Sequence, residues 1–165
     1  MSDTIESADT FGYDQDFYAW TQAQAAALRT AARSGPNLPV DWENVAEEIE
    51  RLGKSDAREL RSRIATIIEH LLKLEFAPAA LPRTDWIDTI DRSREAFETL
   101  IAESPSLRPR VAEWVAGAHA GAARAVLRNL SRHDELDHAL AARIDARRYS
   151  ADEVMRDWWP PEQES

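Results

Sequence analysis

Residues 41–76 read DWENVAEEIERLGKSDARELRSRIATIIEHLLKLEF, and this stretch decides the expected fold. Its apolar residues recur at the spacing of one face of an α-helix. The spacing keeps its phase at Gly53, where a loop would usually reset it. It therefore predicts one long helix from a cap at Asp41 to about Phe76, with a bend allowed at the glycine. The alternative is two helices, the second capped by Ser55. The recurring apolar residues are Val45, Ile49, Leu52, Leu60, Ile64, Ile67, Leu71 and Leu74.

The flanking segments carry the marks of further helices, separated by proline and glycine. We expect a first helix over 14–33, capped by Asp14, a third from about residue 84, and a fourth from the Ser104-Pro105 pair. Apolar spacing predicts a fifth helix around residues 136–144, and a capping-box pattern predicts a short one over 150–158. The expected fold is all-α: a helical bundle of four main helices around one long central helix, with short C-terminal helices.

Length and charge limit the classes of protein that this chain can represent. Its 165 residues suit one domain. We expect a flexible N-terminal tail over 1–12, a single helical-bundle domain over 13–159 and a C-terminal tail over 160–165. The formal net charge of −10 argues against binding to nucleic acid or to anionic membranes.

Cysteine and targeting signals are the next constraints. The chain has no cysteine, which excludes disulfide scaffolds and thiolate metal sites. The first ten residues, MSDTIESADT, are acidic and polar, unlike a signal peptide, and no apolar run reaches the roughly 20 residues of a membrane span. We therefore expect a cytoplasmic protein.

Four of the six tryptophans fall one to each predicted main helix. We expect one large ring per helix to anchor the core, since aromatic side chains are mainly buried. The alternative is a stacking platform for a ligand. These residues are Trp20, Trp42, Trp86 and Trp114.

Glu48 is the first polar residue on the predicted apolar face, between Val45 and Leu52. A carboxylate buried there must be paired or carry a raised pKa. Glu48 is therefore a candidate general base or metal ligand. The structural alternative is an ion pair with Arg92 or Arg94 that holds the helices in register.

His70 is the second polar residue on this face, beside Ile67 and Leu71. It is a candidate base or ligand, and the alternative is a hydrogen-bonded core histidine. On a continuous helix, Glu48 and His70 lie about 33 Å apart at 1.5 Å per residue. They share a site within one chain only if the chain reverses at Gly53, although a dimer could bring Glu48 of one copy to His70 of another.

The run HDELDH at 133–138 is a candidate metal site. It places His133 with Asp137, and Asp134 with His138, at the i, i+4 spacing that lets two helical ligands face one metal ion. A complete site needs further ligands and supporting hydrogen bonds. The alternative is an exposed helix end.

Residues 41–55, DWENVAEEIERLGKS, strongly resemble a bacterial family of small helical proteins, domain-of-unknown-function family twenty-nine. The resemblance implies an all-helical protein whose activity is unassigned. The stretch RHDELDHALAARIDARR at 132–148 departs from the family pattern. Further matches are YDQDFYAW at 13–20, IIEHLLK at 67–73, SPSLRP at 104–109 and WWP at 158–160.

No motif for phosphate binding, a nucleophile elbow or a zinc protease occurs. We therefore predict a non-catalytic interaction or accessory module that acts through a helical face, without a cofactor. The partner is a second copy or another protein. Gly117 and Gly121 lie four residues apart and let another backbone approach closely, either in a dimer or within the core. The alternative function is a metal-dependent or acid–base enzyme with its site around Glu48.

Overall fold

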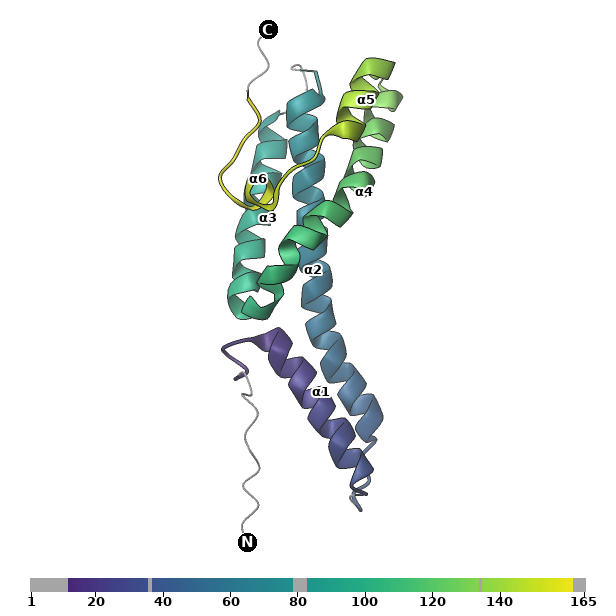
Figure 1. Ribbon diagram of the computed structural model, residues 1–165, viewed down its shortest axis with the longest axis vertical. Helices are drawn as coiled ribbons and strands as arrows, with labels where there is room; N and C mark the ends of the chain where they lie inside the picture. The colour runs from purple at the N-terminus through teal and green to yellow at the C-terminus, as the bar shows by residue number, and fades with distance from the viewer. Residues whose placement is uncertain (1–11, 36, 79–82, 134, 162–165) are drawn as a thin grey trace. The chain divides into compact units, whose positions relative to one another are not determined.

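The computed structural model describes residues 12–35, 37–78, 83–133 and 135–161. These residues form helices and contain no strand, which confirms the predicted all-α fold (Figure 1). In chain order the helices are α1 (Phe17–Arg33), α2 (Trp42–Phe76), α3 (Arg83–Glu103), the 3₁₀ helix η1 (Pro105–Arg110), α4 (Val111–Arg132), α5 (His138–Ala146) and α6 (Ala151–Met155).

The chain divides into two compact units, which are described separately. Unit 1 comprises Met1–Arg58 and Leu100–Arg108, and unit 2 comprises Glu59–Thr99 and Pro109–Ser165. Three helices, α2, α3 and η1, contribute residues to both units.

The α2 helix runs without interruption from Trp42 to Phe76, which confirms the long helix and excludes two helices separated at Gly53. Asp41 caps its start, because the carboxylate accepts a hydrogen bond of 3.2 Å from the Asn44 backbone N–H. Glu43 lies in the first turn and Lys73 in the last, where each charge stabilises the adjacent end of the helix dipole.

In unit 1, α1 and the first part of α2 lie side by side (Figure 1), and small residues lie at their contact. Ala46 and Gly53 are buried on α2, and Thr21 and Ala25 are buried on α1. Ala46 and Gly53 lie seven residues apart, hence on one face of the helix. The contact therefore depends on close backbone approach rather than on large apolar side chains.

The start of α1 is fixed by a different aspartate from the one predicted. The N-cap is Asp16 rather than Asp14, and its carboxylate accepts a 2.8 Å hydrogen bond from the Ala19 N–H. The same carboxylate accepts hydrogen bonds from the Ser106 N–H (2.6 Å) and hydroxyl (2.9 Å). Asp16 is 2% exposed, and these partners compensate for its burial. One side chain thus caps α1 and attaches it to η1.

In unit 2, the second part of α2 supplies most of the predicted apolar stripe to the core. Its buried residues include Leu60, Ile64, Ile67, Ile68, Leu71, Leu72 and Leu74. The α5 and α6 helices pack against α4. The Ser150–Glu153 capping box forms as predicted, although α6 ends at Met155 rather than near Trp158. The prediction that one tryptophan per main helix anchors the core is confirmed fully at Trp114, which is 6% exposed. Trp20, Trp42 and Trp86 are half-buried.

Candidate interaction surface

The first half of the predicted apolar face of α2 is not core. Val45 is 41% exposed and Leu52 is 54% exposed, with the half-buried Ile49 between them. The prediction that this face is buried was wrong at Val45 and Leu52, because α1 packs on the neighbouring face that carries Ala46 and Gly53. Val45, Ile49 and Leu52 follow one another at i, i+4 and i+7, and we call them the α2 stripe.

Exposed apolar side chains are concentrated in unit 1. Of the six large hydrophobic residues that are exposed in the described parts of the chain, five belong to this unit. Leu38 and Val40 lie just before α2 and are 60% and 40% exposed. Concentrated exposed apolar surface is typical of a binding site, whereas single exposed hydrophobic residues are ordinary. The remaining members of the six are Tyr13, Val45, Leu52 and, in unit 2, Ile87.

Glu48 lies beside the α2 stripe and is exposed to solvent. Its carboxylate pairs with Arg51, three residues later on the same helix, at 2.8 Å. The expectation of a carboxylate buried on the apolar face, paired with Arg92 or Arg94, was therefore wrong. Burial was the reason to consider Glu48 as a base or a metal ligand, and that reason no longer applies.

Arg29 connects α1 to the start of α2. Its guanidinium donates to Glu43 and Glu50, at 2.9 Å in each case. Hydrogen bonds from Lys54 and Arg29 hold the pKa of Glu50 below its ordinary value. Since all of these groups lie at the surface, we assign to them orientation of the two helices rather than a large share of the stability.

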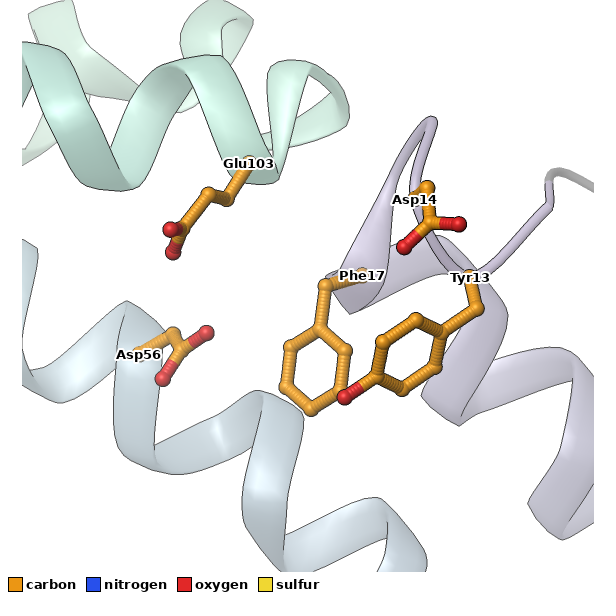
Figure 2. A pocket seen from close by; sticks show the side chains of 5 residues that line it. All are labelled: Tyr13, Asp14, Phe17, Asp56 and Glu103. Atoms are coloured by element: carbon orange, nitrogen blue, oxygen red, sulfur yellow. The ribbon is translucent and has the colours of Figure 1, made fainter.

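The α2 stripe leads towards an acidic pocket. Asp56 follows Leu52 by one helical turn and lines a cavity of about 390 Å³. Figure 2 shows the Asp56 and Glu103 carboxylates facing one another across the opening, with the rings of Tyr13 and Phe17 beside them. The two rings meet edge to face, 5.3 Å apart. Asp14 is the third carboxylate in the lining, and none of the lining residues in the described chain is basic.

Three carboxylates and two aromatic rings form a suitable environment for an organic cation. Carboxylates attract an ammonium or guanidinium group, and aromatic faces add a cation–π contribution. Residues 1–28 contain five acidic and no basic residues, so the sequence around Tyr13 and Asp14 reinforces this negative charge.

The other predicted site residues lie apart from this surface. His70 is half-buried in unit 2, and its Nδ1 lies 2.9 Å from the Thr66 carbonyl oxygen, which must accept. Burial lowers the pKa of His70, with a smaller opposing effect from this hydrogen bond. Because α2 is continuous between Glu48 and His70, the two side chains do not share a site within the chain.

The residues of the predicted metal site do not lie on one helix. His133 is the C-cap that follows α4, whereas Asp137 caps α5 by accepting a 2.7 Å hydrogen bond from the Leu140 N–H, and His138 begins that helix. The residues spaced i, i+4 in this run therefore do not lie one turn apart on a single helix. Asp134 lies outside the described residues. Among the residues that are described, no group of three or more His, Asp or Glu side chains is arranged to hold a metal ion.

Sequence reasoning missed a polar cluster that lies in unit 2. Glu75 accepts hydrogen bonds from the Tyr149 hydroxyl (2.7 Å) and from Arg147 Nε (3.0 Å), and Arg147 also reaches Glu153 at 3.0 Å. Burial, followed by the bond to Glu75, raises the pKa of Tyr149. These partners are far apart in sequence, so no local motif indicates them.

Arg94 is 8% exposed and holds the C-terminal segment. It donates to the carbonyl oxygens of Val154 (3.0 Å), Glu153 (3.1 Å) and Trp158 (2.9 Å). Its guanidinium also lies over the Trp159 ring, 4.8 Å from the centroid. The sequence indicated an ion pair for this arginine, but its partners are backbone carbonyls and an aromatic ring.

These features define a small all-α protein with an exposed apolar and acidic surface. Its sequence matches the family described as "Domain of unknown function DUF29" over residues 12–159, and the chain belongs to this family. It is also similar to a crystal structure of an alpha-helical protein of unknown function from Rhodospirillum rubrum. That likeness has a TM-score of 0.71 and 25% sequence identity, and it covers 88% of this chain and 90% of the other.

The comparison with curated proteins gave no match. In the described part of the chain, no helix has both the length and the apolar character needed to cross a membrane.

Proposed function

We propose that the protein is a non-catalytic interaction module that binds an amphipathic helix of a partner protein along α2. The observation that carries this proposal is the α2 stripe, in which Val45 and Leu52 are exposed and Ile49 is half-buried although the spacing is that of a buried face. Accessible apolar residues at i, i+4 and i+7 match the pattern by which one helix receives another. The cytoplasmic location expected from the sequence is part of the same proposal, and the lack of cysteine is compatible with it.

The charges beside the stripe indicate the character of the partner. Glu48 lies at the middle of the stripe, and the pocket with Asp14, Asp56 and Glu103 lies beyond its end. A partner helix with apolar residues on one face and lysine or arginine at its flanks complements this surface. One of its basic side chains would enter the pocket beside Tyr13 and Phe17.

A second copy of this chain fits the surface less well. Each copy carries a formal net charge of −10, and two acidic surfaces repel one another. The Gly117 and Gly121 positions on α4 are exposed, and no atom of the described chain lies closer than 4.0 Å to a Cβ added at either. They do not serve the core, so self-association through them stays a prediction.

The alternative of an enzyme centred on Glu48 loses its premise, because Glu48 is exposed and paired with Arg51. We therefore base the proposal on the α2 stripe alone.

Binding of two designed helical peptides tests the proposal. Both carry leucine at i, i+4 and i+7, and one has lysine flanks where the other has glutamate. We expect fluorescence anisotropy to show binding of the lysine peptide only. Leu52→Ser should weaken that binding by about tenfold, since burial of a leucine side chain contributes about 1.5–3 kcal/mol.

Ile87→Ser is the matched control, because it makes a similar change at an exposed apolar residue of unit 2. Equal binding of both peptides would contradict the expected charge of the partner. Equal binding to wild type and Leu52→Ser would contradict the assignment of the stripe.

A further inference from the structure

A second cavity lies in unit 2, between the start of α3 and the C-terminal segment. Its volume is about 420 Å³, near the lower end of the range for small-molecule sites. Its lining combines apolar side chains with one arginine and two aspartates. This mixture differs from the acidic pocket of unit 1 and indicates a different class of ligand.

Arg83 provides the first indication of that ligand. Its Nη2 donates a 2.7 Å hydrogen bond to the Leu74 carbonyl oxygen, which fixes the guanidinium in the cavity wall. Its Nη1 is buried and has no hydrogen-bond partner in the described chain. A buried N–H of a charged group is costly without an acceptor. A carboxylate is the acceptor that best matches a guanidinium.

Asp91 and Asp157 provide the second indication. Both are exposed and both line the cavity. Asp157 accepts a 2.8 Å hydrogen bond from Trp159 Nε1, which orients the indole ring in the same wall. The Arg94 guanidinium lies on that ring, 4.8 Å from its centroid. The lining thus carries one guanidinium and two carboxylates, so a ligand with both a carboxylate and an ammonium group finds a partner for each charge.

The apolar part of the wall supplies the third indication. Ile87 is 36% exposed. In the described part of unit 2, no other large hydrophobic side chain is exposed. It lines the cavity together with Leu74 and Trp159. An apolar group placed there would remove the Ile87 side chain from water.

We infer that this cavity binds a small zwitterion with a large apolar side chain, of the class of leucine or phenylalanine. The ligand carboxylate accepts a hydrogen bond from Arg83 Nη1. The ammonium group donates to Asp91 and Asp157, and the side chain lies against Ile87 and Trp159. This inference concerns unit 2 and is independent of the function proposed for unit 1.

Calorimetric titration with three related compounds tests each part of the inference. L-phenylalanine carries both charged groups, 3-phenylpropanoate lacks the ammonium group, and phenethylamine lacks the carboxylate. We expect L-phenylalanine to bind at least about tenfold more tightly than either of the others, since each of them lacks one charged group that hydrogen-bonds in the proposed site.

Two variants test which residues bind the two charged groups of the ligand. Arg83→Gln should weaken phenylalanine binding by about tenfold, and Asp91→Asn should do so without affecting the fold, because Asp91 is exposed. Arg92→Gln is the control, since Arg92 is exposed on the same helix and contacts the Asp88 carbonyl of its own helix. Absence of phenylalanine binding at millimolar concentration would overturn the inference. So would equal binding of the three compounds, or equal binding to wild type, Arg83→Gln and Asp91→Asn.

Discussion

Gly53 of α2 lies so close to Thr21 of α1 that a Cβ at position 53 would overlap the threonine hydroxyl. The same Cβ would lie 3.2 Å from Tyr18 Cδ2 and 3.3 Å from Thr21 Cβ. The glycine therefore sets the separation of the two helices in unit 1. Its place in the middle of a long helix, where glycine is ordinarily unfavourable, follows from this contact.

Gly53→Ala should destabilise the protein by up to about 2 kcal/mol. The added methyl group forces α1 away from α2 at a cost of about 1–3 kcal/mol, and better helix propensity offsets about 1 kcal/mol of that cost. Urea unfolding followed by circular dichroism measures the difference.

Gly117→Ala is the matched control for this substitution. Apart from the backbone of its own helix, no atom of the described residues lies within 4 Å of a Cβ added at Gly117, so alanine there should stabilise the protein by roughly 0.5–1 kcal/mol. If the two alanine variants prove equally stable, the close contact between Gly53 and Thr21 does not exist in solution.

Leu52→Ser should change the free energy of unfolding by no more than about 0.5 kcal/mol, because the side chain is already largely exposed. Leu71→Ala, at a residue of the same helix that is 0% exposed, should cost about 2–5 kcal/mol. Thermal unfolding of both variants tests this contrast. A large destabilisation by Leu52→Ser would show that another part of the chain covers the stripe.

Stability should decrease as the pH falls below about 6.5, the ordinary pKa of histidine. Burial lowers the pKa of His119, and the charges of Arg148 and Arg147 lower it further, against a smaller opposing effect of Asp145. Burial also lowers the pKa of His70. The unfolded chain therefore binds protons at these residues before the folded chain does. Their contribution is fully present above the unfolded pKa and is lost as the pH falls towards the folded pKa.

His119→Gln should remove part of this dependence. Urea unfolding at several pH values between 5 and 8 measures the slope for each protein. An identical slope in wild type and variant would mean that the protonation of His119 is the same in the folded and unfolded states.

Arg94→Met should release the C-terminal segment from α3, because it removes three hydrogen bonds to backbone carbonyls. We expect a cost of about 3 kcal/mol and faster amide hydrogen exchange over residues 151–159. Arg92→Met is the control at an exposed arginine two residues earlier. Unchanged exchange in Arg94→Met would contradict the role assigned to the guanidinium.

The sequence predicted the continuous α2 helix well, because apolar periodicity and helix phase are local properties. It did not show which part of the apolar face is covered. Ala46 and Gly53 are not prominent in a hydrophobic pattern. They nevertheless make the contact with α1, and Val45 and Leu52 remain exposed. Periodicity identifies an apolar face but not the element that packs on it.

The polar contacts were less predictable. The hydrogen bonds from Arg94 to Val154 and from Tyr149 to Glu75 join residues 60 and 74 positions apart. Such pairs depend on the tertiary arrangement, so spacing along the chain does not reveal them. Glu48 is the opposite case: its partner is Arg51, three residues later on the same helix, so a local pair was overlooked in favour of a distant arginine.

Backbone amide chemical shifts of labelled protein, titrated with the lysine-flanked leucine peptide, test the central claim most directly. The account predicts that the largest changes fall at Val45, Ile49, Leu52 and Asp56 and at residues 13–17. Chemical-shift changes confined to other positions, or no chemical-shift change at peptide concentrations up to a millimolar, would contradict the assignment of α2 as the binding surface.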